Sequence, residues 1–171
     1  KDRYSGNITK KLLIDNFVTG MTSLVRRECF EQIGLFDESL PMGIDYDLWL
    51  RFSTKYEFLY FDEVTYLYRI WTGQMSKNSL VRYECGKRIM NNFIKANRSL
   101  LDDDCIDTAW THMYMSKGDY LAQIKGGKRE AIKYYIKALK INKTYIHAWK
   151  AIMKVIFMDI KTNILKINSS R

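Results

Sequence analysis

The chain has 171 residues, of which 47% are hydrophobic and 14% aromatic. That is too much apolar area for a disordered chain and enough for one core, or for a partial domain with a helical appendage. No stretch approaches the roughly 18 apolar residues of a membrane span, and the polar first residues lack the apolar core of a signal peptide. The net charge of +9 has two interpretations: the protein binds an anionic partner, or the lysines are scattered over a surface that only contacts water.

The N-terminal third combines patterns of both strands and helices. Residues 17–25 are rich in β-branched side chains and predict a strand, interrupted by Gly20. A glycine inside a strand often marks the close approach of a ligand or another segment to the backbone. Residues 26–33 then predict a short helix that stops at Gly34.

A second short helix is predicted over residues 45–54, where Leu48, Trp49 and Phe52 recur at helical spacing. Asp45 and Asp47 fall in its first turn, where the helix dipole favours ionised carboxylates. Two further strands are predicted after it, over residues 56–60 and 64–70.

From residue 79 onward the pattern is helical. Four helices are predicted, over residues 79–100, 107–125, 128–141 and from 145 to at least 157. The acidic run at 102–104 admits a metal site, but a loop that caps the next helix is the more common role of such a run. The fold class expected is therefore α/β over residues 1–78, followed by an all-α region over residues 79–171.

The last helices carry a degenerate repeat. Gly126, Ala131, Tyr135 and Ala138 follow the spacing of the small and aromatic positions in a tetratricopeptide helix pair, and Trp149 falls where the next repeat would place its tryptophan. Three or more such repeats are usually needed to close a core. A single helical hairpin that packs on another element is therefore expected.

The most informative motifs lie between residues 16 and 78. They are Thr19-Gly20, the segment GLFDE at 34–38, the segment DYDLWLR at 45–51, and Tyr68-Arg69 with Ser76 beyond. In this order they resemble the second half of family 2 glycosyltransferases of the GT-A fold, over roughly residues 4–78. The resemblance implies an inverting transfer of a sugar from a nucleotide-sugar to an acceptor hydroxyl.

Asp45 is the catalytic base that this resemblance implies. In the family, the acidic motif before the helix is usually a Glu-Asp pair, and here Ile44 replaces the first acid. A base that takes the acceptor proton typically contributes about 10²- to 10⁴-fold in rate. The structural alternative is that Asp45 is the N-cap of its helix, and the two roles are compatible.

The other matching residues have supporting roles. The resemblance places Thr19, Gly20 and Arg69 at the active site or beside the acceptor, and Asp47 in a structural or acceptor-positioning role. Arg51 stands four residues after Asp47 and can pair with it on the helix. The family often has a histidine two residues after the Tyr-Arg arginine, where this chain has a tryptophan.

The nucleotide-binding half expected of such an enzyme has no counterpart here. About sixteen residues precede the strand predicted at 17–25, and one βαβ unit takes roughly thirty. The chain also lacks an initial methionine, so a fragment that is inactive by itself is expected. The full-length enzyme would use Mg²⁺ or Mn²⁺ at the leaving diphosphate, and none of its ligands is assigned to this chain. The sequence Asp45-x-Asp47 has the Asp-x-Asp pattern of the family's metal-binding motif. Because it lies at the start of a helix, we assign it to the base motif instead.

The partners expected are a nucleotide-sugar donor and a saccharide or lipid-linked acceptor, in the synthesis of a surface polysaccharide or glycoconjugate. Three cysteines without a CxxC spacing fit a reducing cytoplasm, and the basic charge and helical tail fit peripheral association with the inner membrane face. No base-reading motif supports a nucleic-acid partner, whose binding would depend steeply on salt. The alternative function is a tetratricopeptide-like helical module that binds protein without catalysis.

Overall fold

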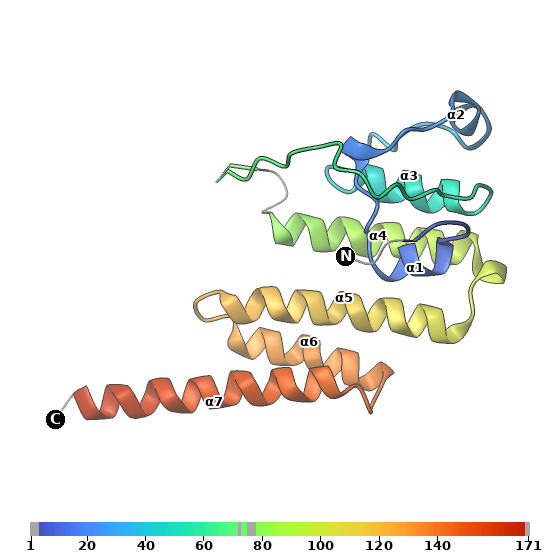
Figure 1. The fold of residues 1–171 in the computed structure, drawn as a ribbon. Helices are drawn as coiled ribbons and strands as arrows, with labels where there is room; N and C mark the ends of the chain where they lie inside the picture. The colour runs from blue at the N-terminus through green and yellow to red at the C-terminus, as the bar shows by residue number, and fades with distance from the viewer. Residues whose placement is uncertain (1–3, 72, 75–77, 170–171) are drawn as a thin grey trace. The chain divides into compact units, whose positions relative to one another are not determined.

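The computed structural model describes residues 4–71, 73–74 and 78–169, with side chains up to residue 157 (Figure 1). Its regular elements are helices joined by loops and extended segments. In chain order they are α1 (Thr9–Ile14), η1 (Gly20–Thr22), α2 (Arg27–Ile33), α3 (Ile44–Ser53), α4 (Ser79–Ala96), η3 (Arg98–Leu100), α5 (Asp103–Gln123), α6 (Lys128–Ile141) and α7 (Ile146–Ser169).

The predicted helices are confirmed. α2, α3 and α6 match their predicted spans to within one residue, and α5 begins four residues earlier than predicted. Gly34 ends α2 as expected, with φ of 99° and a hydrogen bond from its N–H to Phe30 O at 2.8 Å. The capping role of the acidic run is also confirmed, because the Asp102 carboxylate accepts a hydrogen bond from Cys105 N at 2.7 Å. α1 was not predicted.

The predicted strands are wrong. Within the part of the chain that the structure describes, residues 17–25, 56–60 and 64–70 form no sheet, and β pairing is limited to an isolated antiparallel bridge between Gly6 and Phe58. A strand needs a neighbour for its N–H and C=O groups, and these segments have none there beyond that bridge. The α/β fold class expected for residues 1–78 is thus overturned, since the described residues are helical with extended connections.

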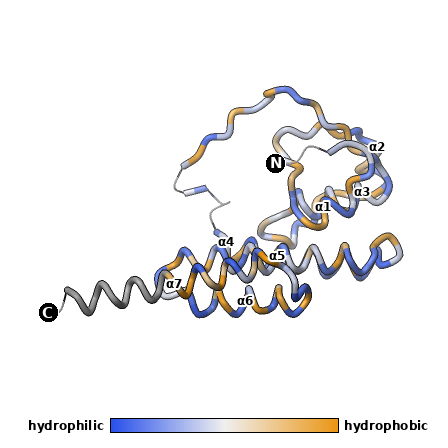
Figure 2. Tube along the Cα trace, turned by 60° about the horizontal axis from the view of Figure 1, so that its bottom comes forward, coloured by the Kyte–Doolittle hydropathy of each residue, from blue (hydrophilic) through white to orange (hydrophobic). Residues whose placement is uncertain are grey.

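The segment from Leu59 to Trp71 has the composition of a strand but no strand partner among the described residues. It runs extended, and its apolar side chains face solvent, with Val64 89% and Leu67 87% exposed. Figure 2 shows it as an arc that carries apolar residues along its length. Its β-rich composition is that of a strand, but composition alone does not supply a pairing partner.

The chain divides into two compact units, residues 1–109 and 110–171, and the division falls inside α5. In the first unit, α3 contacts α1, α2 and α4 (Figure 1). Its apolar residues Leu48, Trp49, Leu50 and Phe52 are almost completely buried. α3 is therefore the central helix of this unit, and the other helices pack around it.

The second unit is a helical hairpin region in which α6 packs on α7. Its core consists of small and aromatic residues, namely Met115, Ala131, Tyr135, Ala138, Leu139, Ala148 and Val155. Alanines at the contact let the helix axes approach closely, and Tyr135 fills the remaining space. Tyr135 also donates a hydrogen bond from its hydroxyl to Asp119 Oδ1 at 2.8 Å.

Gly118 is the glycine on which this packing depends. A Cβ at Gly118 would lie 2.4 Å from Tyr135 Cε1, whereas a Cβ at Gly126 would meet nothing within 4 Å. Gly126 instead takes a positive φ of 80° after α5. The sequence pattern assigned the small position of the repeat to Gly126, but Gly118 is the glycine against the aromatic ring.

No helix among the described residues combines the length and the apolar character that crossing a bilayer requires.

Gly118→Ala is expected to destabilise the second unit by about 1–3 kcal/mol, because the buried Tyr135 ring cannot move away from an added methyl group. The check is urea unfolding of the 171-residue chain, compared with Ser116→Ala, an exposed site on the same helix that is expected to stay within about 0.5 kcal/mol of wild type. Equal stability of the two variants would contradict the packing described for Gly118.

Candidate functional site

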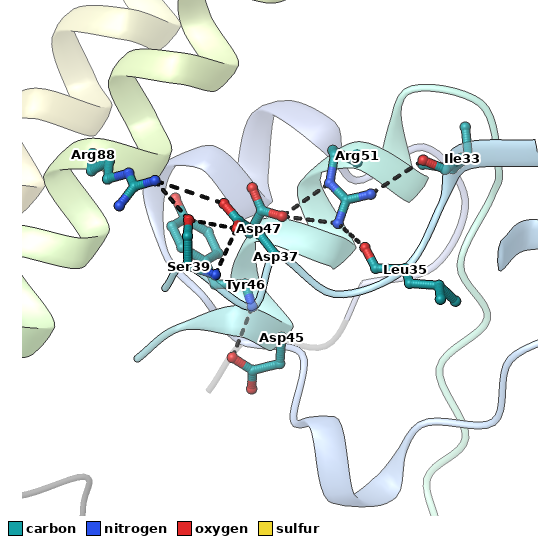
Figure 3. Close-up of polar contacts among 9 residues, drawn as sticks. All are labelled: Ile33, Leu35, Asp37, Ser39, Asp45, Tyr46, Asp47, Arg51 and Arg88. Atoms are coloured by element: carbon teal, nitrogen blue, oxygen red, sulfur yellow. Dashed lines mark hydrogen bonds and ion pairs between the residues drawn. The ribbon is translucent and has the colours of Figure 1, made fainter. Parts of the chain in front are cut away.

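Asp45 lies in the first turn of α3, as predicted. Its Oδ1 accepts a hydrogen bond from the Tyr46 N–H at 2.8 Å (Figure 3). The alternative that Asp45 is the N-cap is wrong, because α3 begins at Ile44 and its N-cap is Gly43. The carboxylate is half-buried and stands where the N–H groups of the first turn and the helix dipole favour negative charge.

Gly20 lies directly beside Asp45, although the two are 25 positions apart in sequence. A Cβ built at Gly20 would meet Asp45 Cβ at 3.3 Å and Asp45 Oδ2 at 3.4 Å. The strand predicted around Gly20 is wrong, since the residue opens η1, yet the close approach of its backbone to another segment is confirmed. Two of the residues that sequence motifs assigned to the site therefore meet.

Gly43 sets the direction in which α3 leaves the preceding loop. It has a left-handed backbone with φ of 79°, which costs other residues roughly 1–2 kcal/mol. A Cβ there would also approach Ile89 Cδ1 of α4 to 3.2 Å. Glycine is thus required at this position for both its conformation and its packing, and this requirement fixes the start of the helix that carries Asp45.

Tyr46 anchors the same turn from the inside. Its hydroxyl donates a hydrogen bond to Leu13 O at the end of α1, at 3.0 Å. Burial raises the pKa of this hydroxyl far above its ordinary value, so that Tyr46 stays neutral and keeps the donor proton. Because Tyr46 is adjacent to Asp45, the hydrogen bond holds the turn in place without involving the carboxylate.

Asp47 and Arg51 form the ion pair that their spacing predicted. Arg51 Nε and Nη2 both lie 2.9 Å from Asp47 Oδ2. The guanidinium also donates to two backbone carbonyls, Ile33 O at 3.3 Å and Leu35 O at 2.7 Å (Figure 3). Arg51 therefore ties α3 to the end of α2 and to the loop that follows Gly34.

Asp45 and Asp47 do not face the same way. Residues two apart on a helix are separated by about 200° of rotation about the helix axis, so they point to nearly opposite sides. Figure 3 shows the two carboxylates directed to different sides of α3. Asp47 is held by Arg51, while Asp45 faces Gly20. The pair does not fit a Mg²⁺ or Mn²⁺ site, and within the described residues no group of three or more His, Cys, Asp or Glu side chains is arranged to hold a metal.

Asp37, from the GLFDE segment, shapes the loop between α2 and α3. Its Oδ1 accepts hydrogen bonds from the N–H and the hydroxyl of Ser39, at 2.9 and 2.6 Å. These hydrogen bonds lower the pKa of the Asp37 carboxyl. Arg88 of α4 donates to the Ser39 hydroxyl at 2.8 Å. This motif acid is accordingly occupied in holding the loop against α4.

The remaining motif residues are Thr19, Arg69 and Ser76, and no hydrogen bond or ion pair that the structure describes joins them to Asp45 or Asp47. The Thr19 carbonyl accepts a hydrogen bond from the Ser23 hydroxyl at 2.8 Å, which closes the turn that places Gly20. Arg69 is exposed on the extended segment, and among the described residues no ion pair or hydrogen bond joins it to Asp45 or Asp47. Ser76 lies outside the described residues.

Three residues that sequence reasoning did not assign help to build the site: Gly43, Tyr46 and Arg88. Gly43 had a signal, since it directly precedes a predicted helix and glycine tolerates left-handed backbone. Tyr46 and Arg88 had none, because their partners are 33 and 49 positions away along the chain.

Two curated proteins of Rickettsia are similar to this chain. The first is an uncharacterized glycosyltransferase of Rickettsia prowazekii, 37% identical over 84 residues. The second is an uncharacterized glycosyltransferase of Rickettsia typhi, 36% identical over 84 residues. These similarities support a glycosyltransferase. They agree with the class of enzyme that the motifs around Asp45 implied.

Each similarity covers 48% of this chain and 26% of the relative. The chain thus spans about a quarter of the length of the curated relatives it matches. It matches no protein-family profile, and no solved structure matches it.

Arg51→Met is expected to lower the free energy of unfolding of the first unit by about 1–3 kcal/mol, because it removes charged hydrogen bonds to Asp47 and to two carbonyls. Urea unfolding followed by tryptophan fluorescence measures the change. In a double-mutant cycle with Asp47→Asn, the two losses should not add.

The matched control is Arg26→Met, which removes an exposed ion pair with Glu28 at 3.6 Å and should change stability little. Additive effects of Arg51→Met and Asp47→Asn, or an equal loss in the Arg26 variant, would contradict the role given to Arg51.

Proposed function

We propose that this chain is the acceptor-side part of an inverting, family 2-type glycosyltransferase, and that Asp45 is its catalytic base. The observation that supports the proposal most is the contact between Gly20 and Asp45. Two separate motifs converge there on one half-buried carboxylate, whereas the neighbouring acids Asp37 and Asp47 are taken up by hydrogen bonds and an ion pair.

In the proposed reaction, the acceptor hydroxyl oxygen bonds to the anomeric carbon of the donor sugar as the bond from that carbon to the nucleotide phosphate breaks. Asp45 takes the proton of the attacking hydroxyl, and the nucleotide leaves with the electron pair of the broken bond. The absence of a side chain at Gly20 leaves Oδ2 of Asp45 accessible to the acceptor. Asp45 needs no partner base, because the hydroxyl becomes more acidic as the new bond forms.

The supporting residues position this carboxylate. The Arg51–Asp47 pair holds the α2–α3 loop in place through the hydrogen bond from Arg51 to Leu35 O. The Thr19 carbonyl closes the turn at Gly20. Arg69 is proposed to meet the acceptor or donor once substrate is bound. The divalent cation expected at the leaving diphosphate stays a prediction for the whole enzyme, because the acids described here do not fit its site.

The donor proposed is a nucleotide-sugar, and the acceptor is a saccharide or a lipid-linked saccharide destined for a surface polysaccharide or glycoconjugate. The donor-binding half is proposed to lie in a longer protein that contains this chain. A cytoplasmic location is part of this proposal.

A tetratricopeptide-like binding module is the second candidate function. It is favoured by the alanine- and tyrosine-based core of the second unit, in which Gly118 packs against Tyr135. Binding of a peptide at residues 107–158, with no nucleotide-sugar activity in the complete gene product, would favour this candidate over the enzyme.

Asp45→Asn in the complete gene product is expected to lower kcat by about 10²- to 10⁴-fold, because the amide cannot accept the hydroxyl proton. The donor Kd should not change, since Asp45 acts on the acceptor. The measurement is nucleotide release from a panel of nucleotide-sugars with Mn²⁺, together with donor binding by calorimetry.

Glu38→Gln is the matched control, because it neutralises an exposed acid in the preceding loop and should leave kcat unchanged. Equal activity of wild type and Asp45→Asn would reject Asp45 as the base. Failure of the complete gene product to bind any nucleotide-sugar would reject the enzyme itself.

A further inference from the structure

Over residues 146–157, whose side chains the structure describes, helix α7 has two apolar faces, and one of them packs inside the second unit. Ala148 and Val155 are buried against the core, with Ala151 and Ile152 partly buried beside them. This inner face follows the spacing i, i+3, i+4 and i+7 of a helix that packs on one neighbour. It accounts for the contact of α7 with α6.

The second apolar face of α7 is exposed, and we call it the α7 stripe. Its side chains are between 40% and 61% exposed, and they are Ile146, Trp149, Met153, Ile156 and Phe157. At about 100° per residue, these positions fall within a sector about 100° wide, directed away from the inner face. Figure 2 shows apolar residues recurring along the described part of α7. A contiguous stripe of this kind marks an interaction surface.

The flank of the α7 stripe is basic. Lys150 and Lys154 are exposed and lie along one edge of the stripe, and residues 146–157 contain no acidic side chain. Trp149 is fixed at the start of the helix by a hydrogen bond from its Nε1 to Lys143 O at 3.0 Å. The surface thus combines aliphatic and aromatic side chains with cations at their border.

The geometry points to an anionic lipid surface as the occupant: we propose that α7 lies in the headgroup layer of a bilayer, with the α7 stripe buried and the lysines on lipid phosphates. Helices that bind in this way have apolar and aromatic residues on one face and lysines beside it. Each lysine near an anionic surface adds to the attraction, and the whole chain carries +9. No helix among the described residues is long and apolar enough to span a bilayer, and the binding proposed here is peripheral.

A second copy of the chain fits the α7 stripe less well. Paired α7 helices would bring Lys150 and Lys154 of both copies to the borders of one interface with no carboxylate from residues 146–157 to meet them. Like charges placed at such borders oppose pairing. An anionic surface removes this repulsion and supplies the opposite charge.

Vesicle co-sedimentation of the 171-residue chain tests the proposal. Wild type should bind vesicles of phosphatidylcholine with about one third phosphatidylglycerol at least about tenfold more tightly than pure phosphatidylcholine, and salt should weaken the binding. Met153→Gln/Phe157→Gln should reduce binding to the anionic vesicles about tenfold or more, because it removes two of the apolar side chains that insert. Lys150→Glu/Lys154→Glu should reduce it to a similar extent.

Two controls match these variants in composition. Ile124→Gln/Ile136→Gln removes exposed isoleucines of the same unit outside α7, and Lys125→Glu/Lys140→Glu changes the net charge by the same amount as the α7 lysine pair. Both controls should keep more than half of the wild-type affinity, and circular dichroism should show unchanged helix content in every variant. A blue shift of tryptophan emission on binding should be smaller in Trp149→Phe.

Three results would overturn the proposal. The first is that wild type fails to bind the anionic vesicles or binds neutral ones equally well. The second is that the controls lose as much affinity as the α7 variants. The third is a wild-type dimer in analytical ultracentrifugation that Met153→Gln/Phe157→Gln dissociates, which would assign the α7 stripe to a second copy.

Discussion

Helix α3 is held at both ends by side-chain hydrogen bonds to α1, and the arrangement of the first unit depends on this attachment. Tyr46 donates to Leu13 O at one end, and Thr9 donates to Ser53 O at 2.7 Å at the other. Between these points the buried face of α3 fills the core, so the helix can neither slide nor rotate without exposing Leu48 and Leu50. Its polar positions then have fixed directions, with Asp45 toward Gly20 and Arg51 toward the end of α2. A site built on such a helix is more precise than one built on a loop.

The sequence predicted the helices well because their signals are local. Periodic apolar residues, Gly34 at a helix end and Asp102 at a helix start act over a few residues, and the structure places them as expected. The strands failed because pairing is a long-range property. Residues 64–70 have the composition of a strand, but among the described residues they find no neighbour to complete a ladder. The small glycine of the second unit was misassigned for a related reason, since the contact of Gly118 with Tyr135 depends on how α5 meets α6.

The candidate site was predicted in part. Spacing alone gave the Asp47–Arg51 pair, and motif order placed Thr19-Gly20 and Asp45 in one site. The additional partners of Arg51, the carbonyls of Ile33 and Leu35, could not be read from spacing, because they depend on where α2 ends. The structure also gives different roles to acids that the sequence alone does not distinguish. Asp37 and Asp47 stabilise the loop and the helix, and this leaves Asp45 as the motif acid whose carboxylate faces another motif.

The most direct test of the account is Gly20→Val in the complete gene product, assayed by nucleotide release and donor binding. The valine side chain must displace the Asp45 carboxylate, because a Cβ at Gly20 already lies 3.3 Å from Asp45 Cβ. Misplacement of a catalytic group by about 1 Å can cost about 10²-fold in rate, so kcat should fall by that order while the donor Kd and the melting temperature stay close to wild type. Met21→Val, at the exposed next residue, should keep full activity. Unchanged kcat in Gly20→Val would contradict the assignment of Asp45 and Gly20 to one catalytic site.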